Sequence, residues 1–253
     1  MKFSIVTISY NQGKYLKECI DSVLSQKSVD FEYIIVDPGS VDGSRELINS
    51  YKEIKKVFKK DNGPAEGLNN GFKEASGDYF GFINADDYLL PQSLFKVQQE
   101  IIKSRSSFLS GNGLIKKQDN QFKFIKPSKM SMNKMLYNSA IFFQPSTFFS
   151  SRLYHMINGF NHSNQSCWDY ELFVDFLSTN AKHHIFDENL SVFRWHSDSI
   201  TVSGRQNESI KIDVRRIFEK YKKRKYNNID KTVTLFQKII RKLSKKHYDK
   251  FNF

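Results

Sequence analysis

Short apolar runs alternate with helical apolar patterns along residues 1–105. The β-branched runs Phe3–Tyr10 and Phe31–Val36 predict buried strands, and each precedes a turn-rich loop and an amphipathic helix. A shorter strand is expected around Val57–Lys59, again followed by a helical pattern. Strands that alternate with helices predict a mostly parallel sheet with helices on both faces. In such a sheet, ligands bind beyond the carboxyl ends of the strands.

The stretch GDYFGFINADDYLLP contains a fourth predicted strand, which stops at Asn84, Ala85, Asp86 and Asp87. Its aromatic and apolar residues suit a buried strand, and Gly81 allows a neighbouring chain to approach closely. Carboxylates at a strand end can hold a divalent ion whose remaining ligands are diphosphate oxygens. The alternative interpretation is a turn with aspartates that cap the next helix.

Polar residues follow all four predicted strands: Tyr10, Asn11, Asp37, Asp61 and Asp86. Each of them alone is explained by turn geometry. Independent turns, however, give no reason for all five to converge at one edge of a sheet. The pattern therefore predicts a binding site at this edge.

The second half of the chain predicts antiparallel strands and further helices. The segments SFLSGNGLIKK and QFKFIK are typical of a hairpin, and residues 130–137 predict a short helix. Gln144 and Pro145 interrupt an aromatic strand, where a proline indicates an edge or a bulge. Asp169 is expected to cap an apolar helix. The segment HHIFDENLSVFRWHSDSIT predicts a strand pair, and His196 is either a third metal ligand or an ordinary loop histidine.

Two amphipathic helices with basic faces are expected after Ser209. Residues 211–253 hold 15 of the 39 lysines and arginines but only 4 of the 27 aspartates and glutamates, so nearly all of the net charge of +12 lies there. The electrically balanced body, and a tail that lacks interleaved aromatics at a groove-like spacing, argue against a nucleic-acid partner. The basic helices either lie on anionic lipid or pack on the rest of the protein.

No run of apolar residues is long enough to span a bilayer, and the start MKFSIVTISYNQG is unlike a signal peptide. The sequence thus predicts a cytoplasmic protein, with peripheral attachment to the inner face of the cell membrane as one alternative for the tail. Cys19 and Cys167 are too few and too isolated for a disulfide framework or a zinc site.

Taken together, these segments resemble a family 2 glycosyltransferase with the GT-A fold. FSIVTISYNQGKYLKECIDSVLSQ is similar to the family's first strand and helix, and FEYIIVDPGSVDGS to its nucleotide-binding turn. DNGPAEGLNNGFKEASGDYFGFINADDYLLP resembles the segment that leads into the Asp-x-Asp motif. QPSTFF, GFN, WDYELFVDF and FRWHSDSIT resemble the acceptor half in the expected order. The resemblance covers residues 2–203 and is strongest to enzymes that build capsular, O-antigen or other cell-surface glycans.

The resemblance implies roles for particular residues. Those expected to bind the nucleotide-sugar are Thr7, Tyr10, Asn11, Asp37, Asp61, Asn84, Ala85 and Asp86. Mn²⁺ or Mg²⁺ would be held by Asp86 with His196, and less so by Asp87, because Asn84 replaces the first aspartate of the motif. Asp169 matches the base of inverting members, and Trp168 replaces the preceding glutamate. Gln144 and Trp168 are expected on the acceptor side.

The resulting hypothesis is an inverting, metal-dependent hexosyl- or N-acetylhexosaminyltransferase. It would move a sugar from a nucleotide diphosphate donor, expected to be a UDP-sugar, to a saccharide or a lipid-linked saccharide. The expected domains are a GT-A unit at 1–205, with a nucleotide-sugar half (1–105) and an acceptor half with a small antiparallel sheet (106–205), and a basic helical extension at 206–253. A nucleotidyltransferase and a non-catalytic protein that binds glycans or membrane surfaces are the alternatives.

Overall fold

The structure is a computed structural model that describes residues 1–196, 199 and 206–248. Within these residues, nine strands form one sheet: β1 (Lys2–Ile8), β2 (Asp30–Val36), β3 (Ile54–Val57), β4 (Tyr79–Asn84), β5 (Tyr88–Leu89), β6 (Phe108–Lys116), β7 (Phe122–Ile125), β8 (Thr147–Ser150) and β9 (His184–Arg194). The α-helices of the described residues are α1 (Gly13–Leu24), α2 (Ser44–Ser50), α3 (Pro64–Lys73), α4 (Ser93–Ser104), α5 (Met132–Leu136), α6 (Ser151–Met156), α7 (Trp168–Ser178), α9 (Asn207–Lys222) and α10 (Asn228–Tyr248).

The N-terminal half of the sheet is parallel, as predicted. Its strands follow the order β3-β2-β1-β4, and Ile8 at the end of β1 pairs with Val36 of β2 and with Asn84 of β4. The three inner strands therefore end level with one another, and the loops that follow them leave from one edge. The prediction for the third strand was a few residues late, because β3 ends at Val57 and does not begin there.

The antiparallel strands extend this same sheet and do not form a second, small sheet. Strand β8 pairs with β4 on one side and with β6 on the other, and β6 and β7 form the predicted hairpin. The prediction of an edge or a bulge at Pro145 was wrong. Pro145 lies in a 3₁₀ turn, Gln144–Ser146, before β8 begins, so its missing N–H removes no hydrogen bond from the sheet.

The predicted strand pair after residue 183 is one long strand, β9. The polar residues Asp187, Glu188 and Asn189 resemble a turn in the sequence, but they lie where the register against β6 shifts. Near its end, β9 also pairs with the short strand β5. The last part of the predicted pair, at residues 197–198 and 200–201, lies outside the described residues.

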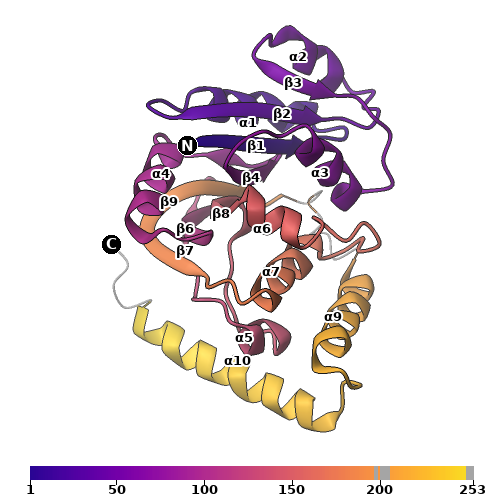
Figure 1. The fold of residues 1–253 in the computed structure, drawn as a ribbon, viewed down its shortest axis with the longest axis vertical. Coiled ribbons are helices and arrows are strands. Elements are labelled where there is room, and N and C mark those ends of the chain that lie inside the picture. Colours follow the sequence, from indigo (N-terminus) through magenta and orange to yellow (C-terminus); the bar gives the residue numbers. More distant parts are fainter. Residues whose placement is uncertain (197–198, 200–205, 249–253) are drawn as a thin grey trace.

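Helices cover both faces of the sheet (Figure 1). Successive residues of a strand point to opposite faces. In β1, Phe3 and Ile5 accordingly belong to a core that includes residues of α1 and α4, whereas Val6 belongs to a second core with residues of α3, α6 and α7. Gly81 of β4 permits the close approach expected from the sequence, because a Cβ atom there would lie 2.7 Å from the Phe148 ring.

The two C-terminal helices differ in how they pack. Ile217 and Phe218 of α9 are buried in the core that contains α7, so this helix packs on the rest of the protein. Helix α10 lies on the opposite side of the molecule from β3 and α2 (Figure 1). The predicted boundary between 205 and 206 directly follows residues 200–205, which lie outside the described part of the chain, and stays a prediction. No helix in the described part is both long and apolar enough to cross a membrane.

Candidate active site

The loops that follow β1 and β2 are tied together by Asn11. Its backbone N–H donates to Ser40 Oγ at 2.8 Å, and its side-chain Oδ1 accepts from the backbone N–H of Val41 at 3.0 Å. Asn11 has a φ of 52°, a left-handed conformation that asparagine adopts more readily than most residues. Tyr10 beside it is exposed. The level strand ends thus place these two predicted residues at one edge of the sheet.

Asp37 follows β2 and is buried at this edge. Its Oδ1 accepts hydrogen bonds from the backbone N–H groups of Gly39 and Ser40, and from Arg45 Nε at 3.0 Å. Burial raises the pKa of Asp37, but the hydrogen bonds from Ser40, Arg45 and Gly39 outweigh it and hold the pKa below its usual value. Oδ2 of Asp37 is buried without a partner, which leaves one oxygen for a ligand.

Asp61 lies in the loop after β3, and its carboxylate is close enough to Asp37 for their charges to interact. Burial raises the pKa of Asp61, opposed by a hydrogen bond from Gly63 N–H and reinforced by the charges of Glu66 and Asp37. Gly63 has a φ of 139°, and a Cβ there would lie 2.5 Å from Gln165 Oε1. This close approach brings the loop before α7 against the loop of Asp61.

Three residues predicted to bind ligands lie inside the fold. Thr7 is fully buried, and its hydroxyl forms a hydrogen bond with Tyr33 Oη at 2.9 Å. Ala85 is buried as well, and Gln144 Nε2 donates to the backbone oxygen of Phe82 at 2.7 Å. The side chains of Thr7 and Gln144 are therefore buried and have partners within the protein.

Asp86 and His196 are in direct contact although 110 positions separate them. Asp86 Oδ2 and His196 Nε2 are 2.9 Å apart, and both side chains are mostly buried. The short strand β5 explains this contact: Tyr88 pairs with Val192, so the residues just before β5 lie opposite those at the end of β9. The same pairing brings the backbone N–H of Arg194 to Asp87 Oδ1 at 3.0 Å.

Buried polar atoms without partners gather around this contact. They are Asn84 Oδ1, Asp87 Oδ2 and His196 Nδ1. Buried polar atoms in proteins are nearly always hydrogen-bonded, so such a group suits a bound ligand. Burial, and next the negative charge of Asp86, raise the pKa of Asp87 well above its usual value. One oxygen of Asp87 is thus committed to the backbone N–H of Arg194.

These residues fit a divalent ion that a ligand helps to hold. Among the residues that the structure describes, no three His, Cys, Asp or Glu side chains are grouped closely enough to bind a metal by themselves. Asp86 and His196 offer a carboxylate oxygen and an imidazole nitrogen that are hydrogen-bonded to each other at 2.9 Å, and both are atom types that bind divalent ions. Mn²⁺ and Mg²⁺ commonly complete such a shell with phosphate oxygens and water.

Sequence reasoning missed the aromatic and basic residues that surround His196. The Arg194 guanidinium lies over the Tyr15 and Tyr88 rings, 5.1 and 5.0 Å from their centroids, and pairs with Glu18 at 2.5 Å. The Tyr15 ring also packs on His196, with 4.8 Å between the ring centroids. Tyr15 and Glu18 are three positions apart on α1 and therefore share a face, but the predicted helix began at Leu16 and did not include Tyr15.

Asp169 lies in the first turn of α7, but it is not the helix cap. Cys167 occupies the N-cap position, and Asp169 Oδ1 accepts from the backbone N–H of Tyr170 at 2.7 Å. Burial raises the pKa of Asp169 to about 6, and the Tyr170 hydrogen bond offsets only part of this effect. A carboxylate with this pKa can accept a proton near neutral pH. Trp168, the residue before Asp169, is partly buried and packs against the hydrophobic core.

The fold is that of the GT-A glycosyltransferases. The chain superposes on Staphylococcus aureus TarS 1-349 in complex with UDP-GlcNAc with a TM-score of 0.73 and 19% identity, over 96% of this chain and 73% of that one. It superposes on the mannosyltransferase PcManGT of Pyrobaculum calidifontis, in complex with GDP-Man and Mn²⁺, with a TM-score of 0.65 and 13% identity, over 94% and 69% of the two chains.

The sequence comparisons identify the family. The family model described as glycosyl transferase family 2 matches residues 4–160, so the chain belongs to this family. An uncharacterized glycosyltransferase of Nostoc sp. is 38% identical over 102 residues, which is 38% of this chain and 32% of the relative. Chondroitin synthase of Pasteurella multocida is 27% identical over 195 residues, 72% of this chain and 19% of the relative. The chain spans about a third of the length of the first curated relatives it matches.

Proposed function

We propose that this protein is an inverting, metal-dependent glycosyltransferase that transfers a sugar from a UDP-sugar to a saccharide or lipid-linked saccharide of a cell-surface glycan. The observation that carries the proposal is the contact between Asp86 and His196 beside the level ends of β1, β2 and β4. Relatives that include a chondroitin synthase support a polysaccharide product, and the complex of TarS with UDP-GlcNAc supports a UDP-sugar donor. Family membership favours this function over a nucleotidyltransferase.

The donor would lie across the carboxyl edge of the parallel strands. Asn11, with Tyr10 exposed beside it, and Oδ2 of Asp37 would contact the nucleoside, and Asp61 lies next to Asp37. Asp86 and His196 would hold Mn²⁺ or Mg²⁺, and Asn84 would face the same ligand. When bound, the ion neutralises the negative charge that grows on the leaving diphosphate.

Asp169 acts as the general base in this proposal. The acceptor hydroxyl oxygen forms a bond to the anomeric carbon from the face opposite the diphosphate, and the bond from that carbon to the diphosphate oxygen breaks. The hydroxyl proton passes to a carboxylate oxygen of Asp169, and the nucleoside diphosphate leaves with the electron pair. Trp168 next to Asp169 would border the acceptor. General base catalysis of this kind contributes about 10²- to 10⁴-fold to the rate.

The pH dependence of donor hydrolysis tests this assignment. With Mn²⁺ and UDP-GlcNAc, and water as the acceptor, kcat/KM for UDP release should rise about tenfold per pH unit below pH 6 and level off above it. The rise is expected because Asp169 must be ionised to accept a proton and its pKa is raised to about 6. GDP-mannose serves as the comparison donor. A protein that binds neither donor by calorimetry and releases neither nucleotide would contradict the proposed function and favour the non-catalytic alternative.

The partner of helix α10 in this proposal is an anionic membrane surface. Its polar side contacts the protein: Gln237 Oε1 accepts from Ser139 Oγ at 2.6 Å, and Asp230 is buried. Its apolar residues face outward, with Ile229, Leu235 and Phe236 each more than 60% exposed. Lysines flank this stripe, so its charge complements anionic lipid.

Vesicle binding measures the role of α10. The protein should co-sediment with vesicles that contain about a third phosphatidylglycerol, and bind much less to pure phosphatidylcholine or at high salt. Phe236→Ser should weaken this binding about tenfold or more, because burying a phenylalanine is worth roughly 1.5–3 kcal/mol. Phe122→Ser on β7, where the ring is 52% exposed, is the matched control. Unchanged binding by the α10 variant, or a dimer in solution that this variant dissolves, would overturn the assignment.

A further inference from the structure

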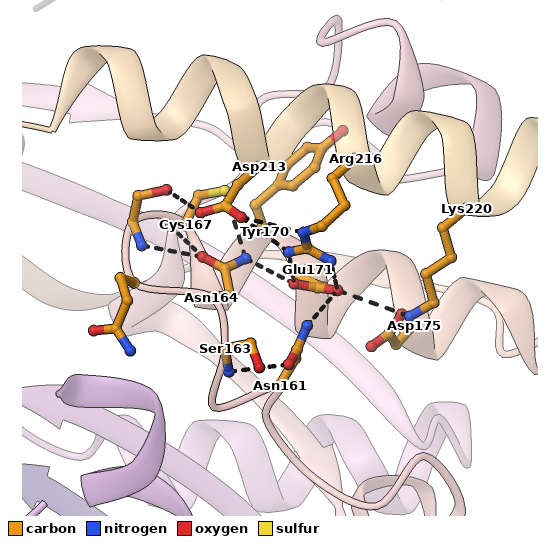
Figure 2. A network of polar contacts seen from close by, with 12 residues as sticks. Asn161, Ser163, Asn164, Cys167, Tyr170, Glu171, Asp175, Asp213, Arg216 and Lys220 are labelled. Atoms are coloured by element: carbon orange, nitrogen blue, oxygen red, sulfur yellow. Dashed lines mark hydrogen bonds and ion pairs between the residues drawn. The ribbon is translucent and has the colours of Figure 1, made fainter. Parts of the chain in front are cut away.

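Helix α9 runs parallel to α7 and is linked to it by a row of polar contacts (Figure 2). The contacts follow the same order along both segments: Ser166 with Asp213, Glu171 with Arg216, and Asp175 with Lys220. The residues that α9 contributes are three or four positions apart, so they share one face of the helix. That face also buries Ile217 in the core. Helix α9 is therefore fixed in its position relative to α7.

Glu171 is the centre of this network. It is 1% exposed, and Arg216 donates to both of its oxygens, from Nη1 at 2.9 Å and from Nη2 at 2.7 Å. Asn161 Nδ2 and Asn164 Nδ2 donate to the same two oxygens at 3.1 and 2.7 Å. Burial raises the pKa of Glu171, but the hydrogen bonds from Arg216, Asn164 and Asn161 outweigh it and keep the pKa low. A buried carboxylate with four donors is held in one orientation.

Asn164 links the Glu171 carboxylate to the backbone that precedes Asp169. Its Oδ1 accepts from the backbone N–H groups of Ser166 and Cys167 at 3.1 and 2.9 Å. Ser166 Oγ donates to Asp213 Oδ2 at 2.6 Å, so α9 holds the same segment a second time. Cys167 is the N-cap of α7, and Asp169 follows two positions later. The start of α7 thus depends on contacts with α9.

We propose that Arg216 is a positioning residue for Asp169. Through Glu171 and Asn164, its guanidinium fixes the segment 161–167 and with it the direction in which the Asp169 carboxylate points. The inference rests on the proposed role of Asp169 as the base. It also makes α9 a part of the catalytic unit and not a dispensable extension. Arginine suits this position because its planar fork binds both oxygens of one carboxylate, which lysine cannot do.

Proton transfer to Asp169 depends on the position of its carboxylate. A misplacement of about 1 Å at a reacting group can lower the rate about 10²-fold. Arg216→Gln should therefore lower kcat for UDP release from UDP-GlcNAc by about 10- to 100-fold. The Kd of UDP-GlcNAc should change less than about twofold, because the residues proposed to bind the nucleotide-sugar lie on the loops after β1, β2 and β4. Arg216→Lys keeps the charge and loses the planar fork, so its kcat should lie between that of Arg216→Gln and that of the unmodified protein.

Two controls separate positioning from general loss of structure. Arg215→Gln removes the same charge from the same helix, but Arg215 is exposed and lies over the Tyr226 ring. Lys220→Gln removes the bond to Asp175 and a longer ion pair with Glu171 Oε1 at 3.8 Å, but it leaves the four hydrogen bonds to Glu171 in place. Both variants should keep kcat within about twofold of the unmodified protein. In hydrogen exchange, peptides that cover 161–172 should lose protection in Arg216→Gln and keep it in both controls.

Different results would contradict the positioning role of Arg216 and the base role of Asp169. If Arg216→Gln lowers the unfolding temperature but keeps normal kcat, or if exchange in 161–172 is unchanged, Arg216 does not position Asp169. If Asp169→Asn retains normal turnover, the assigned base is wrong, and the exchange experiment still measures whether segment 161–167 depends on Arg216. A fall in kcat with unchanged donor binding and faster exchange in 161–172, in Arg216→Gln alone, is the result we expect.

Discussion

Replacing Asp169 by Asn is expected to lower kcat for UDP release by about 10²- to 10⁴-fold while the Kd of UDP-GlcNAc stays unchanged. Asparagine has nearly the same shape as aspartate but cannot accept the proton of the attacking hydroxyl. The side-chain amide oxygen can still accept the hydrogen bond from Tyr170 N–H, so the start of α7 should keep its conformation. Single-turnover kinetics and calorimetry measure the two quantities separately.

Asp78→Asn is the matched control for this variant. Asp78 is exposed and accepts a hydrogen bond from the backbone N–H of Lys2, at the end of the sheet where β1 and β4 begin. It should leave turnover unchanged. Turnover within about threefold of normal in Asp169→Asn would exclude Asp169 as the base, and a parallel loss of donor binding would mean that the residue contributes to the donor site.

The edge of the parallel sheet could be predicted from the sequence because local patterns determine it. Each apolar run ends at a polar residue, and parallel strands place their carboxyl ends on one side. Asn11, Asp37 and Asp86 accordingly lie at the ends of three level strands. Thr7 follows a different rule: it lies within a strand, two residues before the loop, and the alternation of the strand directs its hydroxyl into the core toward Tyr33.

Contacts that depend on tertiary structure could not be predicted in the same way. The strand β5 has two residues, too few for a periodic pattern, yet it determines that His196 reaches Asp86. The pair of Glu171 and Arg216 joins residues 45 positions apart, and either one in a sequence is typical of a solvated helix face. The raised pKa of Asp169 arises from burial, which no local pattern indicates. The positions of these residues at the sheet edge were therefore easier to predict than the contacts that they make.

Replacing Asp86 by Ala is expected to remove the dependence of donor binding on Mn²⁺. In the proposed site Asp86 and His196 would hold the ion together, and of the two only Asp86 carries a negative charge when ionised. The Kd of UDP-GlcNAc with Mn²⁺ should rise on the order of 100-fold, or about 2.7 kcal/mol, and should equal the value measured without metal. Titration calorimetry with Mn²⁺ and with a chelator gives both values.

His196→Ala tests whether the second side chain contributes to the same ion. It should weaken Mn²⁺-dependent binding less than Asp86→Ala does, because a neutral imidazole adds no charge to the site. The double variant Asp86→Ala/His196→Ala should lose less binding free energy than the sum of the two single losses, since the two side chains are in contact. Asp119→Ala, in the turn between β6 and β7, is the control and should bind normally. An Asp86→Ala protein that keeps its Mn²⁺ dependence would exclude this aspartate as a metal ligand, and Asp87 with its unpartnered Oδ2 would then be the carboxylate to replace next.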